Sequence, residues 1–448
     1  MKFELQETVS ESPMSRFQVA AVVLCIALNM LDGFDVLAMA FTAPHVAADW
    51  HLTGKQVGLL LSAGLFGMGA GSLLIAPLAD YVGRRPIILI SLLTISGGML
   101  LSAIAQNVFQ LAATRIISGL GIGSLLASLM VITSEYASNR WRSAAVSMEA
   151  AGYALGATIG GAISGVLLAH FDWRSVFVFG GLTTAAMIPL ALVYLPESLD
   201  FILARRPRNA LPRINAILAR MDRAQVDELP PPPSNLELNE RAVGLRSLFS
   251  GKLALRTCMI WLTFFLAMAS LYFVLSWTPK LFVQMGMSAA QGLTLGVLLN
   301  VGGIVGSTAF SLLAARIRLR TLLVMYLATS AALLVLFGAV ASSLDIAMPV
   351  AVVIGAGISG CIGGIYALTP TLYPARARTT GMGLAIGIGR IGAVVAPFSA
   401  GLLVDAGWHV PSLYFLFAVP LLAALVTVTV ICNELSRTDF GRTPITAT

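Results

Sequence analysis

Two carboxylates, Asp32 and Asp35, lie inside a long apolar segment, in the stretch NMLDGFDVLAMA. Their spacing of three residues puts both side chains on one face of a helix, with Cβ atoms about 5–6 Å apart. Two carboxylates so close in a poorly hydrated site cannot both ionise cheaply, so such a pair can bind and release protons. The structural alternative is a capped kink at Gly33, with one Asp satisfied by a neighbouring helix. We favour proton binding, because an ionisable group at the centre of a bilayer costs roughly 2.5–3.5 kcal/mol on insertion scales.

Two arginines, Arg115 and Arg390, also lie within apolar segments. A guanidinium offers a planar fork that matches a carboxylate through two hydrogen bonds, so Arg390 is our first choice for binding an anionic substrate. The alternative for Arg390 is an ion pair with an acid such as Glu149. Arg115 lies at a depth similar to that of the two Asp residues. It is interpreted either as a substrate-binding or coupling residue or as one half of a static ion pair.

Three further polar residues interrupt apolar runs. Glu149 is predicted to take part in proton transfer, and an ion pair with Arg142 or another cytoplasmic arginine is an equally weighted alternative. Asn300 and Tyr366 are predicted to line a substrate pocket, and ordinary hydrogen bonding between helices is the alternative for both.

The apolar segment from Leu253 to Thr278 is rich in aromatic residues. A ring from this segment could stack on an aromatic substrate, and we single out Phe264 and Phe265 for that role. Most of the rings are instead expected to face lipid or to lie in the interfacial belt. The rings are Trp261, Phe264, Phe265, Tyr272, Phe273 and Trp277.

Cysteine and histidine positions do not indicate a metal site. The four cysteines fall in separate apolar segments without CxxC spacing, and the four histidines lie at predicted outward ends or loops. We therefore predict no metal, no disulfide framework and no cofactor. Because no nucleophile and base converge, a membrane enzyme also lacks support.

The elements that position these groups follow from composition. Of the 448 residues, 57% are hydrophobic and 11% are charged, and the mean hydropathy is +0.87. Soluble domains carry about 25% charged residues, so an all-α integral membrane protein is predicted. A spanning helix needs about 20 apolar residues, and twelve segments qualify. They are Phe17–Phe41, Gln56–Ala79, Pro86–Gln106, Phe109–Thr133, Ser143–Ala169, Val176–Leu195, Leu253–Thr278, Ala290–Ala314, Thr321–Ala341, Ile346–Pro370, Thr380–Leu403 and Ser412–Cys432.

The distribution of positive charge predicts the orientation. With both termini in the cytoplasm, 23 of the 28 Lys and Arg residues fall in inward segments. The outward loops hold only Lys55, Arg174 and Lys280. This asymmetry follows the positive-inside rule. The net charge of +7 is therefore interpreted as a topology signal, and nucleic-acid binding is not predicted.

The chain is predicted to consist of two six-helix bundles, 1–195 and 253–448, joined by a polar cytoplasmic linker, 196–252. The linker contains Pro230–Pro233, expected to be a stiff break, and a short helix is expected around Ala210–Met221. The halves also look alike, because RSAAVSMEAAGYALGATIGGAISGVLL aligns without gaps to RTTGMGLAIGIGRIGAVVAPFSAGLL. This alignment places Gly156 opposite Gly392 and Ala154 opposite Arg390. Internal repeats with a binding site between them are typical of transporters.

Four motifs in the first half resemble those of the major facilitator superfamily: PLADYVGRRP (77–86), RIISGLGIG (115–123), GYALGATIGG (152–161) and LPESLDFIL (195–203). The resemblance implies twelve transmembrane helices in two pseudo-symmetric six-helix bundles that work by alternating access. It also implies a conformational latch at the helix ends, for which charge anchoring with a helix cap is the alternative. The latch residues are Asp80, Gly83, Arg84, Arg85, Glu135 and Arg142.

The chain departs from the loop motif at Ala76, where glycine is usual, and from its second-half copy at Ala315, where Asp is expected. Glycines at small-residue spacings are interpreted as helix-packing positions, because they lie within apolar helices and do not follow a strand as a phosphate-binding loop would. They are Gly119, Gly121, Gly123, Gly152, Gly156, Gly160, Gly383, Gly387 and Gly392.

Two stretches narrow the resemblance to the aromatic acid:proton symporters: LDGFD (31–35) and GIGRIGAVVAP (387–397). A glycine usual after the second Asp of that family is absent from DVLAMAFTAP. The family imports benzoate-like and hydroxybenzoate-like carboxylates into bacteria with protons. The resemblance implies a multi-pass protein of the bacterial inner membrane, whose partners are an aromatic carboxylate, protons and lipid, and which acts as a monomer. Asp32 and Asp35 would take up protons from outside, Arg390 would bind the carboxylate, and rocking of the halves would carry both inward.

Rival interpretations remain at this point. A related transporter could carry another solute: an aliphatic organic acid, a sugar, or a drug in exchange for protons. A transporter-like membrane sensor would bind its ligand without flux.

Overall fold

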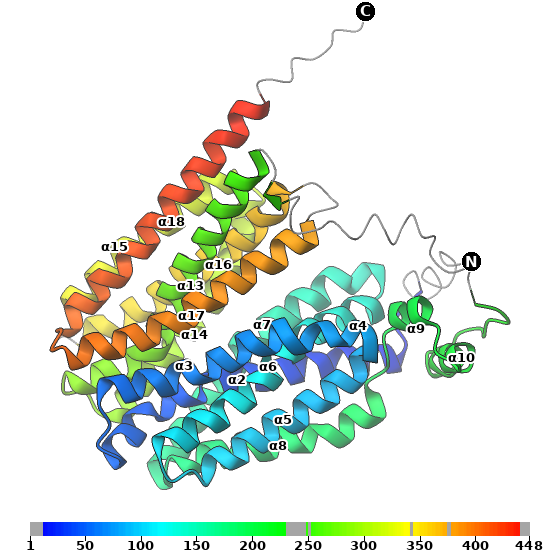
Figure 1. The fold of residues 1–448 in the computed structure, drawn as a ribbon, viewed down its shortest axis with the longest axis horizontal. Coiled ribbons are helices and arrows are strands. Elements are labelled where there is room, and N and C mark those ends of the chain that lie inside the picture. Colours follow the sequence, from blue (N-terminus) through cyan, green and yellow to red (C-terminus); the bar gives the residue numbers. More distant parts are fainter. Residues whose placement is uncertain (1–11, 230–247, 250–251, 341–343, 374–377, 440–448) are drawn as a thin grey trace, which may run out of the picture. The chain divides into compact units, whose positions relative to one another are not determined.

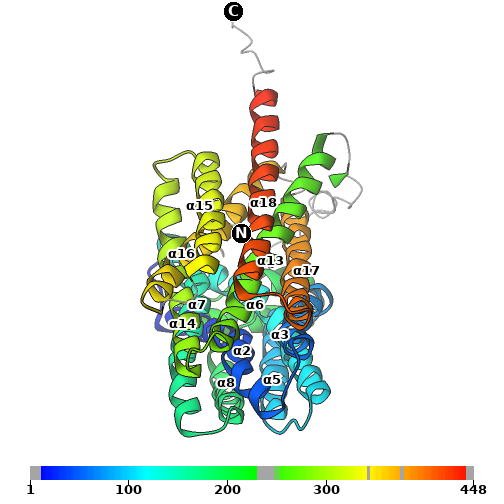
Figure 2. The ribbon, with the colours of Figure 1, turned by 90° about the vertical axis from the view of Figure 1, so that its left-hand side faces the viewer.

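The computed structural model describes residues 12–229, 248–249, 252–340, 344–373 and 378–439, and the regular elements in these ranges are helices (Figures 1 and 2). Twelve helical stretches of this described part are long and apolar enough to cross a membrane, and each coincides with a predicted span. The prediction of an all-α membrane protein with twelve transmembrane helices is therefore confirmed. The first span was expected to end at Phe41, but its helix continues through Pro44 to Asp49.

The chain divides into two compact units, an N-terminal unit (Met1–Leu238) and a C-terminal unit (Asn239–Thr448). The helices of the N-terminal unit are α2 (Arg16–Asp49), α3 (Gly54–Ala70), the π-helix η1 (Gly71–Ile75), the 3₁₀-helix η2 (Ala76–Leu78), α4 (Ala79–Val82), α5 (Arg84–Ala103), α6 (Val108–Tyr136), α7 (Asn139–His170), α8 (Arg174–Tyr194), α9 (Leu199–Arg205) and α10 (Ala210–Arg220). Those of the C-terminal unit are α13 (Lys252–Gln284), α14 (Ala289–Ala314), α15 (Leu319–Val340), α16 (Leu344–Leu372), α17 (Arg378–Asp405) and α18 (Val410–Asp439).

The same three helix pairings recur in both units. In the N-terminal unit α2 packs on α7, α3 on α6, and α5 on α8. In the C-terminal unit α13 packs on α17, α14 on α16, and α15 on α18. The first span of each unit thus packs on the fifth, the second on the fourth, and the third on the sixth. This shared order is what the predicted internal repeat requires.

Glycines bring the first and fifth spans of each unit into close contact. A Cβ added at Gly156 of α7 would collide with the main-chain oxygen of Met30 in α2. A Cβ at Gly392 of α17 would collide with the main-chain oxygen of Phe265 in α13. Small residues let helix backbones approach closely in membranes, so the packing interpretation is confirmed for both positions. At Gly383 no atom of the described residues lies within 4 Å of an added Cβ, so packing there stays a prediction.

Local sequence explains where several helices begin. The Ser15 hydroxyl accepts a hydrogen bond from the Gln18 N–H at 3.3 Å, and the Gln18 side chain accepts one from the Ser15 N–H at 2.9 Å. This capping box satisfies two N–H groups that the start of α2 would otherwise leave open. The same arrangement begins α3 and α14.

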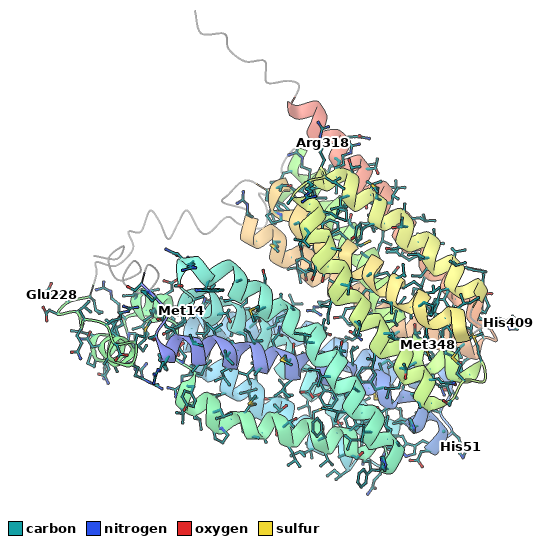
Figure 3. The ribbon with its side chains drawn as sticks, turned by 180° about the vertical axis from the view of Figure 1, so that it is seen from behind. Met14, His51, Glu228, Arg318, Met348 and His409 are labelled. Carbon is teal, nitrogen blue, oxygen red and sulfur yellow. The ribbon has the colours of Figure 1, made fainter. Side chains whose placement is uncertain are left out.

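The ends of each unit can be identified from labelled residues. In the N-terminal unit, Figure 3 shows His51 at one end and Met14 and Glu228 at the other. In the C-terminal unit, His409 and Arg318 lie at opposite ends. Residues predicted to face outward and inward are therefore separated by the length of the helices within each unit, while the direction in the membrane stays a prediction.

The region predicted to be a linker, 196–252, contains α9 and α10. The second of these helices nearly coincides with the short helix expected at Ala210–Met221. Pro230–Pro233 lie outside the described residues, and the division of the chain into two bundles and a cytoplasmic linker stays a prediction.

The rings of α13 are more buried than the sequence predicted. Phe264, Phe273 and Trp277 have no exposed surface, and Tyr272 has little. The expectation that most of these rings face lipid is therefore wrong. Trp277 shows why, because its indole N–H donates a hydrogen bond to the main-chain oxygen of Pro397 at 2.9 Å, a partner that a buried Trp usually finds.

Candidate functional site

Asp32 and Asp35 both lie in the buried part of α2, and their side chains are 3% and 1% exposed. α2 continues as one helix through Gly33, and the choice between proton binding and a kink there stays a prediction. Gly33 is needed for packing, because a Cβ would collide with the main-chain oxygen of Tyr153 in α7. Neither carboxylate oxygen of Asp35 has a hydrogen-bond partner among the described residues. A second glycine makes room for that carboxylate, since a Cβ on Gly180 of α8 would lie 3.0 Å from Asp35 Oδ1.

Arg115 reaches the same place from α6 and is 1% exposed. Its Nη2 donates a hydrogen bond to the main-chain oxygen of Asp35 at 2.6 Å, and its Nη1 approaches Met99 Sδ at 2.8 Å. Its guanidinium carbon lies 5.6 Å from the centre of the Phe177 ring. The predicted Asp–Arg115 pair therefore forms through the main chain of Asp35, while the guanidinium charge still acts electrostatically on the carboxylate.

Glu149 lies on α7 with no exposed surface. Neither of its carboxylate oxygens has a hydrogen-bond partner in the described part of the chain. The alternative ion pair with Arg142 is not formed among these residues, because the Nε of Arg142 donates to the main-chain oxygen of Ser134 at 3.0 Å. The side-chain amide of Asn29 donates a hydrogen bond to the main-chain oxygen of Glu149, which ties α7 to α2.

Arg390 of α17 is held among aromatic residues of the C-terminal unit. Its Nη1 donates a hydrogen bond to the Tyr272 hydroxyl at 3.0 Å. Tyr366 of α16 interacts electrostatically with both Arg390 and Tyr272. The ring of Phe264 packs edge-on against that of Tyr366, with centroids 5.3 Å apart. The arrangement combines a partly exposed cation with neighbouring rings, which suits a ligand that carries both a carboxylate and an aromatic ring.

Two other predicted pocket residues have different surroundings. The amide of Asn300 donates a hydrogen bond to Gly296 O at 2.8 Å, one turn earlier in its own helix. This hydrogen bond lies within one helix and does not join two helices. Phe265 is partly buried, and its main-chain oxygen faces Gly392. The described contacts connect neither residue to Arg390.

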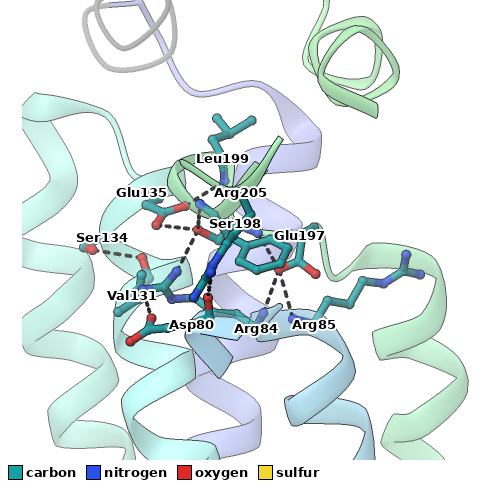
Figure 4. A network of polar contacts seen from close by, with 11 residues as sticks. Asp80, Arg84, Arg85, Val131, Ser134, Glu135, Glu197, Ser198, Leu199 and Arg205 are labelled. Carbon is teal, nitrogen blue, oxygen red and sulfur yellow. Dashed lines mark hydrogen bonds and ion pairs between the residues drawn. The ribbon is translucent and has the colours of Figure 1, made fainter. Parts of the chain in front are cut away.

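The predicted latch residues other than Arg142 come together around a residue that the predicted site did not include, Glu197 (Figure 4). Glu197 Oε1 accepts hydrogen bonds from the main-chain N–H groups of Arg84, Arg85 and Ser198 at 2.8, 3.2 and 2.9 Å. The carboxylate thus caps the N-terminus of α5, where exposed N–H groups and the helix dipole favour an anion. Gly83 precedes this helix with a φ of +112°, and a Cβ there would collide with Glu197.

A second carboxylate extends this network to α6 (Figure 4). Glu135 accepts hydrogen bonds from the Ser198 hydroxyl at 2.7 Å and from the Leu199 N–H at 2.9 Å, at the start of α9. Arg84 donates to the same Ser198 hydroxyl at 3.1 Å and forms an ion pair with Asp80 at 3.4 Å. The network therefore joins α4, α5, α6 and α9 within one unit.

The side chains of two predicted latch arginines donate to main-chain oxygens. Arg85 Nη2 donates to Leu192 O at 2.6 Å, and Arg142 donates to Ser134 O. The motif LPESLDFIL contained the signal for Glu197 and Ser198, but their partner Arg84 is more than a hundred residues away in sequence.

No group of three or more His, Cys, Asp or Glu side chains in the described ranges is arranged to hold a metal ion. The groups described above that could bind protons or an anion are the buried carboxylates, the buried arginine and the arginine flanked by rings.

Comparison with known proteins identifies the family. The sequence model of the Major Facilitator Superfamily matches residues 22–318. The chain is 31% identical to a gallate transporter of Pseudomonas putida, over 95% of this chain and 94% of that protein. It is 30% identical to the 4-hydroxybenzoate transporter PcaK of the same organism, over 96% of each chain.

A similar fold is found among solved structures. The partially occluded, inward-open xylose transporter XylE from E. coli matches with a TM-score of 0.73 and 15% identity, over 92% of this chain and 97% of that one. At this identity the likeness concerns the fold alone. The matched family, the relatives aligned over nearly their whole length and the twelve candidate spans agree, and the chain belongs to the Major Facilitator Superfamily as a multi-pass membrane transporter.

Proposed function

We propose that this transporter imports an aromatic carboxylate together with protons across the bacterial inner membrane. The observation that carries the proposal is the surroundings of Arg390: a guanidinium held by Tyr272 at 3.0 Å, beside Tyr366 and the edge-packed ring of Phe264. The names of the relatives, a gallate and a 4-hydroxybenzoate transporter, support the same class of substrate.

The substrate carboxylate is proposed to bind Arg390 through the two-pronged geometry that guanidinium and carboxylate groups share. The substrate ring then lies against the rings of the C-terminal unit: Tyr272 is hydrogen-bonded to Arg390, Tyr366 interacts with it, and Phe264 packs on Tyr366. Ring and carboxylate together distinguish this ligand from an aliphatic acid, which lacks the stacking surface, and from a sugar, which lacks the charge.

Protons are proposed to bind at Asp32 and Asp35. An anion entering alone moves against the inside-negative potential, at about 2.3 kcal/mol per charge per 100 mV. Protons taken up with the substrate remove this cost and add the pH gradient as a driving force. Arg115 acts as a positioning residue in this scheme, because its hydrogen bond to the main chain of Asp35 fixes α2 against α6.

The network around Glu197 is proposed to act as the conformational latch. Asp80, Gly83 and Arg84 form its α4–α5 part, and Glu135 joins it from α6. Breaking these contacts would free the ends of the helices for the change between states. Transport is proposed to follow alternating access by a monomer, with both termini in the cytoplasm.

Uptake into proteoliposomes tests the proposal. Radiolabelled 4-hydroxybenzoate should exchange in counterflow without a gradient and should accumulate when the outside is made acidic. Unlabelled benzoate should compete, whereas cyclohexanecarboxylate, which has the carboxylate without the aromatic ring, and xylose should compete at least tenfold more weakly. Equal competition by cyclohexanecarboxylate would favour an aliphatic acid transporter. Binding of 4-hydroxybenzoate without any flux would favour a sensor.

A further inference from the structure

A second polar cluster lies on α2, closer to the start of this helix than Asp32. Asn29 precedes Asp32 by three residues, which is about 4.5 Å of helix rise, and Cys25 precedes Asn29 by about one more turn. Cys25 interacts with Glu149 of α7 and with Thr133 of α6. α2, α6 and α7 therefore enclose this cluster within the N-terminal unit, where α2 and α7 pack against each other (Figure 1).

Hydrogen bonding in this cluster is incomplete. Both carboxylate oxygens of Glu149 lack a partner among the described residues, as does the side-chain oxygen of Asn29. Both side chains are buried, with exposed fractions of 0% and 1%. Buried polar groups are normally hydrogen-bonded, and an ionised carboxylate in such a place is far more costly than a neutral one.

No described cation compensates a negative charge on Glu149. From α2, Cys25 interacts with its carboxylate and Asn29 bonds to its main-chain oxygen, and both are neutral groups. The charged residues of α6, Arg115 and Glu135, are engaged with Asp35 and with Ser198. α8, which also packs against α7, has Arg174 as its charged residue, at its first position. Arg142 of α7 itself bonds to Ser134 O.

We propose that Glu149 is a second proton-binding carboxylate of the transport cycle, distinct from the Asp32–Asp35 pair and linked to it through Asn29. This inference rests on the proposed proton coupling. Asn29 holds Glu149 by donating to its main-chain oxygen, and its own side-chain oxygen stays open as an acceptor for a protonated carboxyl group or a water molecule. When the proton moves inward, Asp32 loses the proton that Glu149 gains, and no other bond changes.

The proposal has a quantitative consequence. If Glu149 carries a proton across in each cycle, the ratio of protons to substrate includes its contribution. Replacing it by glutamine, which keeps shape and polarity but binds no proton, should lower this ratio. Exchange of substrate without net proton movement does not need the residue.

The test uses the full chain in proteoliposomes and compares the wild type with Glu149→Gln. Counterflow of 4-hydroxybenzoate should stay within about twofold of the wild type, because the substitution removes no contact with the substrate. A tenfold change would require the loss of about 1.4 kcal/mol of binding free energy. The proton-to-substrate ratio, measured from the membrane potential that balances a known pH gradient, should fall. An unchanged ratio in Glu149→Gln would overturn the proposal. A wild type without proton-linked accumulation would instead refute the proposed function itself.

A spectroscopic readout keeps the proposal testable if the glutamine variant fails to fold. Infrared spectra of wild-type protein with ¹³C-labelled glutamate should contain an isotope-shifted carboxylic acid C=O band. In Glu149→Asp, which keeps an acid at the site but carries no label there, the shifted band should lose intensity relative to the wild type. A shifted band of unchanged intensity in this variant, or a wild type without one, would show that Glu149 is not protonated.

Discussion

Arg115 donates a hydrogen bond to the main-chain oxygen of Asp35 at 2.6 Å, while both carboxylate oxygens of Asp35 stay without a hydrogen-bond partner in the described structure. The arginine thus places a positive charge near Asp35 without forming a hydrogen bond to its carboxylate. A direct two-pronged ion pair would stabilise the ionised carboxylate strongly and would oppose its protonation. The observed geometry leaves the acid able to change its protonation state beside a fixed positive charge.

Replacing Arg115 should therefore affect both stability and coupling. Arg115→Gln removes a donor from a buried carbonyl, which should cost about 1–3 kcal/mol, and should abolish accumulation driven by a pH gradient. Thermal unfolding and uptake measure the two effects. Arg174→Gln is the matched control, because Arg174 forms exposed ion pairs worth about 0–1 kcal/mol. Equal stability of the two variants would contradict the role assigned to Arg115.

Gly180 offers a test of the space around the Asp35 carboxylate. A Cβ there would lie 3.0 Å from Asp35 Oδ1 and 2.5 Å from Met99 Cε. Gly180→Ala should therefore displace the acid or the methionine that contacts Arg115, and uptake driven by the pH gradient should fall at least tenfold. Gly97→Ala is the control, since no atom lies within 4 Å of a Cβ at that position. Loss of uptake in both variants would mean that helix packing in general, and not this site, is sensitive.

The twelve spans could be predicted from sequence because lipid leaves the backbone few choices. Each crossing must be a helix of sufficient apolar length, and such segments are visible without knowledge of their neighbours. The packing of those helices was less visible. Gly156 and Gly383 look alike in sequence, but among the described residues an added Cβ meets the backbone of another helix at Gly156 and meets no atom at Gly383.

Apolar composition also cannot separate a lipid-facing ring from one buried in protein. Most rings of the segment from Leu253 to Thr278 were expected to face lipid or to lie in the interfacial belt, yet Phe273 and Trp277 are fully buried. Both environments are apolar, so the distinction depends on contacts such as the hydrogen bond from Trp277 to Pro397. The role of Glu197 could not be predicted from sequence either, because it caps α5 through a contact between residues that are far apart in the chain.

The capping role of Glu197 predicts a graded response to substitution. Glu197→Ala removes the acceptor of three main-chain N–H groups and should cost about 0.5–2 kcal/mol, the usual range for loss of a helix cap. Glu197→Gln keeps an acceptor oxygen and should lose less. Glu228→Ala, at an exposed position, is the control. Thermal unfolding of the purified variants ranks their stabilities. If Glu197→Ala were as stable as this control, Glu197 would not stabilise the protein as a helix cap.

Arg390 should determine affinity for the carboxylate and not for the ring. Hydrogen bonds to charged groups contribute about 1.5–3 kcal/mol, and 1.4 kcal/mol corresponds to tenfold, so Arg390→Gln should raise the Kd of 4-hydroxybenzoate by about 10–100-fold. Arg390→Lys should also weaken binding, because it keeps the charge but not the planar fork. Tyr272→Phe removes one anchor of the guanidinium and should have a smaller effect.

Ligands without a carboxylate separate this prediction from general damage to the protein. Benzyl alcohol presents the ring without the negative charge, so whatever weak binding it shows should be the same in the wild type and in Arg390→Gln. Calorimetry in detergent measures both ligands on the same samples. If Arg390→Gln bound 4-hydroxybenzoate as tightly as the wild type, the carboxylate would have to bind elsewhere, because a lost charge-assisted pair at Arg390 cannot leave the affinity unchanged.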